Sequence, residues 1–199
     1  MLISFLWFIV FLVAITSIGL MLVRNWRWLI IFLAAQYAGM FILTLQHWPT
    51  GMAAVKVIAG WMGAAILGMT HSNLIEDQIN EKDSLPQGRL FRLLAAGIVG
   101  VIVLTGTPIV DAMMADAGLA VSAGSLTLIG MGLLHLSVTD RIMQVTVGLM
   151  TVLSGFEILY SAVESSTLVA ALLAVINLGL ALVGSYLMVA SNTQEVEPL

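Results

Sequence analysis

Long apolar runs, each about as long as a membrane-spanning helix, alternate with short polar stretches along the chain. A helix that crosses about 30 Å of hydrocarbon needs roughly 20 mostly apolar residues. Seven segments meet this requirement, and the pattern predicts helices over residues 2–23, 28–46, 51–70, 92–110, 121–138, 142–163 and 167–190. The predicted fold class is therefore all-α, a polytopic membrane protein with about seven transmembrane helices.

Composition agrees with this class and restricts the chemistry. Of the 199 residues, 60% are apolar and 9% are charged, and the mean hydropathy is +1.08, whereas a soluble domain carries about 25% charged residues. The absence of cysteine excludes thiolate metal sites, and the three histidines show no metal-ligand spacing. Since no catalytic motif or phosphate loop is present, we expect the chain alone to be no enzyme, without cofactor, metal or nucleic-acid partner.

The basic residues of the connections predict the orientation. Lys and Arg gather on the cytoplasmic side of a membrane. One set of alternate connections contains Arg24, Arg27, Lys82, Arg89, Arg92 and Arg141, and the other set contains no basic residue. We expect a multi-pass protein of the cell (inner or cytoplasmic) membrane, with its N-terminus outside and its C-terminus inside.

One long polar connection divides the chain. Residues 1–70 hold the first three predicted helices, 71–91 form a cytoplasmic loop, and 92–190 hold the other four. The acidic segment 191–199 is predicted to be a disordered tail. The two parts share an arginine-containing turn followed by a helix with a glycine, which suggests two parallel three-helix repeats. The alternative is that apolar helices resemble one another by composition.

Lys56 lies about five residues inside the third predicted span. An ammonium there can snorkel to the interface on its four-carbon stem. Alternatively it faces another helix, because Gly60 and Gly63 lie on the same helical face and glycines permit close helix contact. Both interpretations stay open from the sequence.

Glu157 lies at a similar depth in the sixth predicted span, and a carboxylate has too short a stem to snorkel far. Ser154 and Ser161 share its helical face at steps of three and four residues. The face is interpreted either as hydrogen-bonding surface with one satisfied glutamate or as a proton- or cation-handling site. Lys56 and Glu157 could pair if their helices touch, which would offset the desolvation cost of each charge.

Other polar residues within the spans are His135, Asn177 and Gln36. Asn177 and Gln36 are expected to hydrogen-bond between helices, or to line an ion pathway. His135 is expected to be a satisfied histidine near the cytoplasmic interface, or alternatively a residue of an ion pathway. Trp48, at a predicted helix end, is expected in an aromatic belt at the membrane surface.

The segment LIGMGLLHLSVTDRIMQVTVGLMTVLSGFEILYSA resembles the small membrane subunit K of respiratory complex I. It is also similar to the small C component of Mrp-type cation/proton antiporters and to component E of hydrogenase-4-type complexes. Arg141, Gly148 and Leu149 match the family spacing, which places Met150 where the family has a glutamate. A shifted alignment makes Glu157 that glutamate, and Asn177 lies in the next helix, where the family carries an acidic residue.

The resemblance covers residues 121–190 and implies an integral subunit of a complex that translocates protons or sodium ions. Such a subunit packs beside larger antiporter-like subunits, carries no cofactor itself, and is a non-catalytic part of a redox-driven oxidoreductase or antiporter. The alternatives are a self-contained small membrane transporter and a purely structural membrane scaffold.

Overall fold

The computed structural model describes residues 2–23, 25–74, 88–114 and 117–196. They form the α-helices α1 (Leu2–Leu22), α2 (Trp26–Thr44), α3 (Thr50–Asn73), α4 (Arg89–Met113), α5 (Leu119–Ser137), α6 (Ile142–Val163) and α7 (Thr167–Val196). All seven are long and apolar enough to cross a membrane, and the described residues contain no strand. The predicted all-α class is confirmed for the described residues, and so is the number of helices long and apolar enough to span a membrane.

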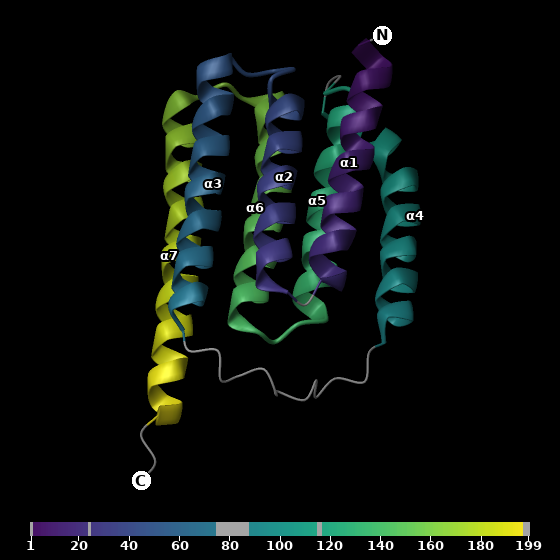
Figure 1. Cartoon of the computed structure of the whole chain (residues 1–199). Coiled ribbons are helices and arrows are strands. Elements are labelled where there is room, and N and C mark those ends of the chain that lie inside the picture. The colour runs from purple at the N-terminus through teal and green to yellow at the C-terminus, as the bar shows by residue number, and fades with distance from the viewer. Residues whose placement is uncertain (1, 24, 75–87, 115–116, 197–199) are drawn as a thin grey trace.

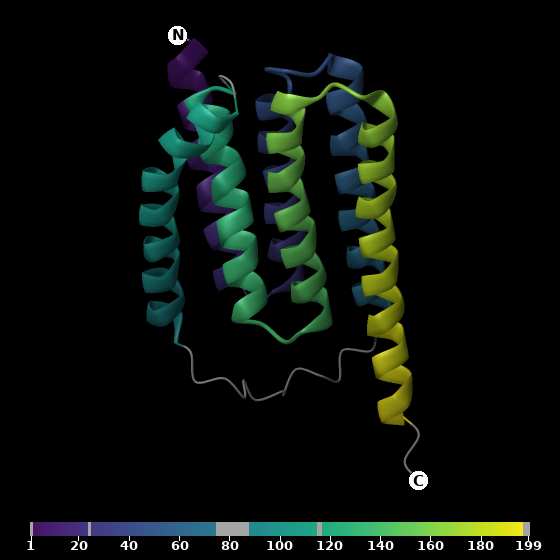
Figure 2. The same cartoon turned by 180° about the vertical axis from the view of Figure 1, so that it is seen from behind.

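Six of the helices form two layers of three, as Figures 1 and 2 show from opposite sides. One layer holds α1, α2 and α3, and the other holds α5, α6 and α7. The layers pack so that α1 contacts α5, α2 contacts α6 and α3 contacts α7. Because successive helices run in opposite directions, the two helices of each facing pair run in the same direction (Figure 1). The seventh helix, α4, lies outside the layers against α5 and α1.

The helices extend beyond the predicted spans where polar residues continue the helical backbone. α3 runs to Asn73 and α4 begins at Arg89, so both ends of the predicted 71–91 loop are helical. Residues 75–87 of that loop lie outside the described residues. The prediction of a disordered tail at 191–199 is wrong for most of its length, because α7 continues to Val196. Residues 197–199 lie outside the described residues. The length of an apolar run indicates only the part of a helix that can lie in hydrocarbon. A helix can continue beyond that run with polar side chains, so its ends are not given by the apolar run.

Glycines set the closest contact between two helices of the same layer, α5 and α6. A Cβ added at Gly155 would lie 2.8 Å from the backbone nitrogen of Ile129 and 2.8 Å from the carbonyl oxygen of Ser125. The Ser125 hydroxyl also donates to the Gly155 carbonyl oxygen at 2.7 Å. Small residues let helix backbones approach in lipid, where no hydrophobic effect draws helices together. The α5–α6 pair is therefore joined by backbone contact as well as by side chains.

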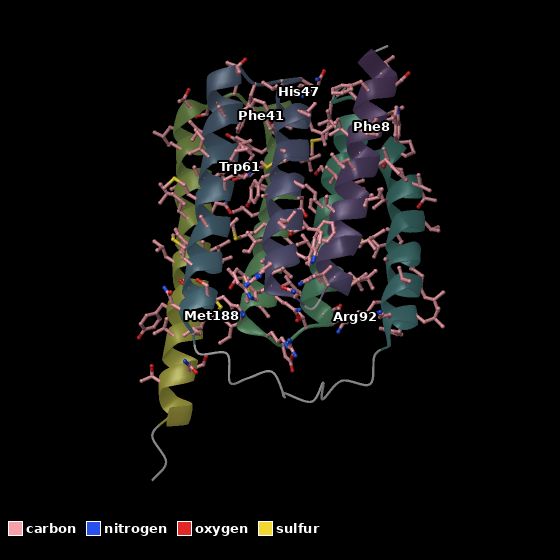
Figure 3. All side chains as sticks on the ribbon, viewed as in Figure 1. Phe8, Phe41, His47, Trp61, Arg92 and Met188 are labelled. Carbon is pink, nitrogen blue, oxygen red and sulfur yellow. The ribbon has the colours of Figure 1, made fainter. Side chains whose placement is uncertain are left out.

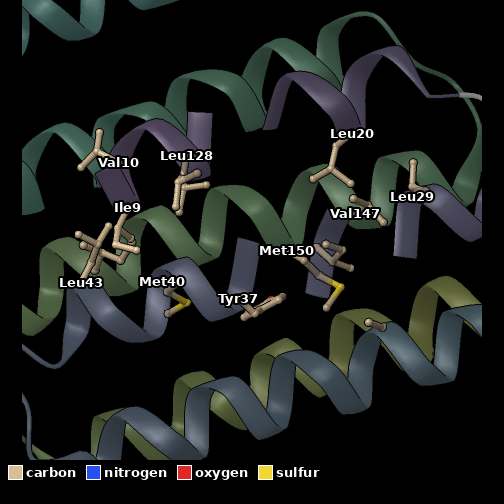
Figure 4. Close-up of a cluster of buried hydrophobic side chains, with 14 of the residues drawn as sticks. Ile9, Val10, Leu20, Leu29, Tyr37, Met40, Leu43, Leu128, Val147 and Met150 are labelled. Carbon is tan, nitrogen blue, oxygen red and sulfur yellow. The ribbon is translucent and has the colours of Figure 1, made fainter. Parts of the chain in front are cut away.

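Between the layers, apolar side chains fill the interior (Figure 4). Leu43 of α2 lies where a Cβ on Gly124 of α5 would be, 2.5 Å from its Cδ1. On the outside of the bundle, large apolar side chains are exposed, including Phe8 and Trp61, which are 61% and 51% exposed (Figure 3). The most exposed helix is α4, of whose apolar window only 17% is buried. These outward faces suit contact with lipid or with other membrane helices.

The prediction for Trp48 is wrong. Its side chain is buried, and its indole Nε1 donates to the Glu164 carbonyl oxygen at 2.8 Å. It also meets the Tyr160 ring edge-on, with centroids 6.3 Å apart. Trp48 therefore ties the α2–α3 connection to the end of α6, instead of lying among lipid headgroups.

Candidate functional site

Two fully buried charged side chains, Lys56 and Glu157, meet between the layers. The Lys56 Nζ lies 2.6 Å from the Glu157 Oε1, and the side chains are 1% and 0% exposed. Lys56 follows the start of α3 by six residues and Glu157 precedes the end of α6 by six, so each lies about 9 Å inside its helix end. The snorkelling interpretation of Lys56 is wrong, because the ammonium points to a carboxylate inside the bundle.

The neighbouring helices bring the charged pair together. α3 faces α7, and α2 lies between α3 and α6. On α3 the residue one turn from Lys56 is Gly60, and the Tyr37 ring of α2 occupies the space that a Gly60 side chain would need. The glycine predicted to permit close helix contact thus admits a tyrosine ring, and the longer Lys56 side chain reaches α6 beside it.

Neutral polar groups extend the site through α2, α6 and α7. The Tyr37 hydroxyl donates to the Asn177 Oδ1 at 2.8 Å. The Gln36 Nε2 donates to the Thr151 Oγ1 at 3.2 Å. The Ser154 hydroxyl donates to the Met150 carbonyl at 2.8 Å and lies close to the Tyr37 hydroxyl. Asn177, Gln36 and Ser154, which the sequence predicts as polar residues within the bundle, are all three buried.

Several buried polar atoms of this site have no hydrogen-bond partner among the described residues. They are the Glu157 Oε2, the Asn177 Nδ2 and the Gln36 Oε1. Buried polar atoms in proteins are normally paired with protein or with ordered water. The site therefore combines one neutralised charge pair with unused donor and acceptor capacity, which is the arrangement needed to accept, hold or pass a proton.

Two of the predicted site residues take no part in these contacts. Ser161 is buried, and its hydroxyl donates to the Ile158 carbonyl of its own helix at 2.6 Å. His135 lies near the opposite end of the bundle and is 5% exposed. Neither of its ring nitrogens has a partner of acceptable geometry among the described residues, although the Gln144 backbone lies nearby. The structure places His135 inside the bundle beside the Gln144 backbone, and the expectation of a satisfied histidine stays a prediction.

Two site residues were not predicted from the sequence, Tyr37 and Thr151. Tyr37 directly follows Gln36 in the middle of an apolar span, and a phenol so far from both interfaces was an available signal. Thr151 carries no comparable signal, since threonine commonly bonds to its own helix, as it also does here to the Val147 carbonyl at 2.8 Å.

A groove of about 280 Å³ lies apart from the site, between α6 and α7. Its lining is mostly apolar, with Asp140 and Thr146 as polar exceptions. Neither Lys56 nor Glu157 lines it, so the buried pair is not reached through this groove. Among the described residues, no three His, Cys, Asp or Glu side chains come close enough together to hold a metal ion.

Comparison of the chain with protein-family models, with curated proteins and with solved structures gives no match. The resemblance of residues 121–190 to small subunits of ion-translocating complexes therefore stays a prediction. The buried pair and its polar surroundings are the observation from which a function can be argued.

Proposed function

We propose that this chain is an integral membrane subunit of an ion-translocating complex of the complex I, hydrogenase-4 or Mrp type, packed beside larger antiporter-like subunits. The single observation that carries the proposal is the Lys56–Glu157 pair, 2.6 Å apart and buried between α3 and α6. An apolar pair of similar volume would stabilise a membrane bundle at least as well. Ionisable residues at such depth usually mark ion or proton pathways.

In this proposal Glu157 is the group that titrates and Lys56 tunes it. An ammonium in contact stabilises the ionised carboxylate, and burial stabilises the protonated one, so the two effects oppose each other. The Glu157 Oε2 has no partner among the described residues and is available to receive a proton. Movement of the Lys56 ammonium by even a small distance would then change the proton affinity of Glu157, which is how a charge shift in a neighbouring protein of the complex could drive the site.

The proposed orientation and the repeat belong to the same hypothesis. Gly39 of α2 contacts Val13 of α1, whose Cγ2 would lie 2.6 Å from an added Cβ. Gly155 has the equivalent place on α6, against α5. These matching glycines, and the facing pairs of helices that run in the same direction, favour two parallel repeats, α1–α3 and α5–α7, with α4 as the linker.

A topology experiment tests the orientation. Reporters fused after residue 199 and within 76–88 should both report the cytoplasm, and one at the N-terminus should report the outside, since six basic residues lie in connections of one side and none in those of the other. An outside signal from the 76–88 fusion would contradict the proposed arrangement.

Copurification and ion movement test the function. A C-terminally tagged chain, extracted with mild detergent from cells that make it naturally, should bring down larger antiporter-like membrane proteins in a constant ratio. The double variant Lys56→Met/Glu157→Gln leaves no charge unpaired, so it should copurify equally. It should nevertheless abolish ion movement in vesicles, because no titrating carboxylate remains.

The matched control is Ser161→Ala, one turn from Glu157, whose hydroxyl bonds only within its own helix. This variant should leave the set of copurifying proteins unchanged, and it should leave ion movement unchanged as well. A chain that purifies alone, and transports in liposomes alone, would replace the proposal by the small self-contained transporter. Full ion movement in the double variant would show that Glu157 does not titrate during transport, and the chain would then have only a structural role in the complex.

A further inference from the structure

His135 is a second buried ionisable group, at the end of the bundle where α5 ends and α6 begins. This end is cytoplasmic in the proposed orientation. Neither ring nitrogen makes a hydrogen bond of standard geometry among the described residues, and the Gln144 backbone lies close to the ring. The Arg92 side chain of α4 lies at the same end of the bundle (Figure 3). Its guanidinium is near enough to act on the ring electrostatically, and its Nη1 donates to the Met21 carbonyl at the end of α1, 3.0 Å away.

Gly148 of α6 makes room for the imidazole. A Cβ at this position would lie 3.3 Å from the His135 Cδ2 and 2.8 Å from the Leu136 Cδ2. His135 therefore packs directly on the α6 backbone. Glu157 lies nine positions after Gly148 on α6, which corresponds to a rise of roughly 13–14 Å along the helix.

The residues at steps of three along α6 between these points each meet a polar partner. Thr151 accepts from Gln36, Ser154 lies beside the Tyr37 hydroxyl, and Glu157 binds Lys56. Three residues turn about 300° around a helix, so each step falls back by about 60° and rises about 4.5 Å. The line of contacts consequently winds about half a turn around α6, from the α5 side at Gly148 to the α3 side at Glu157.

Unpartnered polar atoms occur along the whole line. They belong to His135 at its start, Gln36 and Asn177 in its middle, and Glu157 at its end, and all four side chains are more than nine-tenths buried. Such atoms are normally satisfied by buried water. One imidazole nitrogen can accept a proton while the other releases one, which suits the first position of a relay that faces the cytoplasm.

We infer that a hydrated proton route runs along this line from the cytoplasmic end to Glu157, with His135 as its first residue. A proton taken up by one imidazole nitrogen leaves from the other, passes over water and the Gln36–Thr151 and Tyr37–Ser154 contacts, and reaches the free Glu157 Oε2. Two charged groups that act on the line are Arg92 beside His135 and Lys56 beside Glu157. The route rests on the proposed function, because it serves the titration of Glu157.

The chain has no cysteine of its own, so single cysteines report water access without a background. Thr151→Cys, in the full chain in inside-out vesicles of its native membrane, is treated with the small cationic reagent methanethiosulfonate ethylammonium. Matched controls are Leu149→Cys on the outer face of α6 and Ser125→Cys in the α5–α6 contact. The thiolate is the reacting form, and it is disfavoured in apolar surroundings, so Thr151→Cys should react at least about tenfold faster than either control.

His135 is then varied in the Thr151→Cys background. His135→Leu should slow the labelling severalfold by removing the polar opening, and His135→Gln should restore most of it. Reaction of Thr151→Cys as slow as that of Ser125→Cys, or reaction unchanged by His135→Leu, would overturn the route. Labelling does not depend on ion movement, so the two proposals can fail separately. Slow labelling of Thr151→Cys with intact copurification would refute the route alone. Fast labelling in a chain that purifies without partners would refute the proposed function alone.

Discussion

Lys56→Met should lower the free energy of unfolding by about 3–5 kcal/mol, because it leaves the Glu157 carboxylate, 0% exposed, without its cation. Glu157→Gln should cost about 3 kcal/mol, at the lower end of that range, since the amide oxygen can still accept a hydrogen bond from the ammonium. Both variants keep the volume of the side chain nearly constant, so the loss reports charge and not a cavity. Reversible unfolding in mixed detergent or bicelles gives the free energies.

The double variant Lys56→Met/Glu157→Gln should be at least about 2 kcal/mol more stable than the sum of the single losses predicts, because contacting residues couple strongly. Ile58→Met is a matched control on the same helix, since the Ile58 side chain is 56% exposed on the outer surface of the bundle. It should change stability little in either background. Strict additivity of the two single losses would contradict the 2.6 Å contact.

Gly155→Ala should cost about 3 kcal/mol, the upper part of the usual range for overpacked sites. The added methyl group would lie 2.8 Å from backbone atoms of Ile129 and Ser125, and backbone atoms cannot rotate away as a side chain can. Separation of the helices would also stretch the 2.7 Å bond from the Ser125 hydroxyl to the Gly155 carbonyl. The midpoint temperature of unfolding in detergent should fall accordingly.

Gly100→Ala on α4 is the control for the glycine substitution itself. An added Cβ at Gly100 meets nothing within 4 Å, so the change brings only the better helix propensity of alanine, up to about 1 kcal/mol in favour of the fold. If Gly155→Ala were as harmless as Gly100→Ala, the α5–α6 contact would be looser than described.

The seven spans could be predicted from the sequence because membrane thickness imposes a minimum length on every apolar run. Their ends could not be predicted as well, since Asn73 and Arg89 continue helices into the interface without any apolar signal. Trp48 shows a related limit. Tryptophan at a helix end is enriched at interfaces, but whether the indole turns outward or, as here, inward to the Glu164 carbonyl depends on neighbouring helices.

The buried pair was half predictable. The sequence placed Lys56 and Glu157 at equal depth, with opposite charges on different helices. It could not show that they touch, because that contact requires the two layers to face each other and Gly60 to admit the Tyr37 ring. Tyr37 and Thr151 complete the site through contacts to distant helices, and no local pattern in α2 or α6 announces those partners.

The separation of the pair along the chain has a consequence for biosynthesis. Lys56 and Glu157 are 101 positions apart, so at about 5–20 residues per second the ribosome needs roughly 5–20 s to supply the partner. Throughout that interval α3 carries a lone amine in or beside the bilayer, at an insertion cost of about 2.5–3.5 kcal/mol. A nascent chain stalled before α6 therefore carries an unpaired lysine that the finished chain neutralises with Glu157.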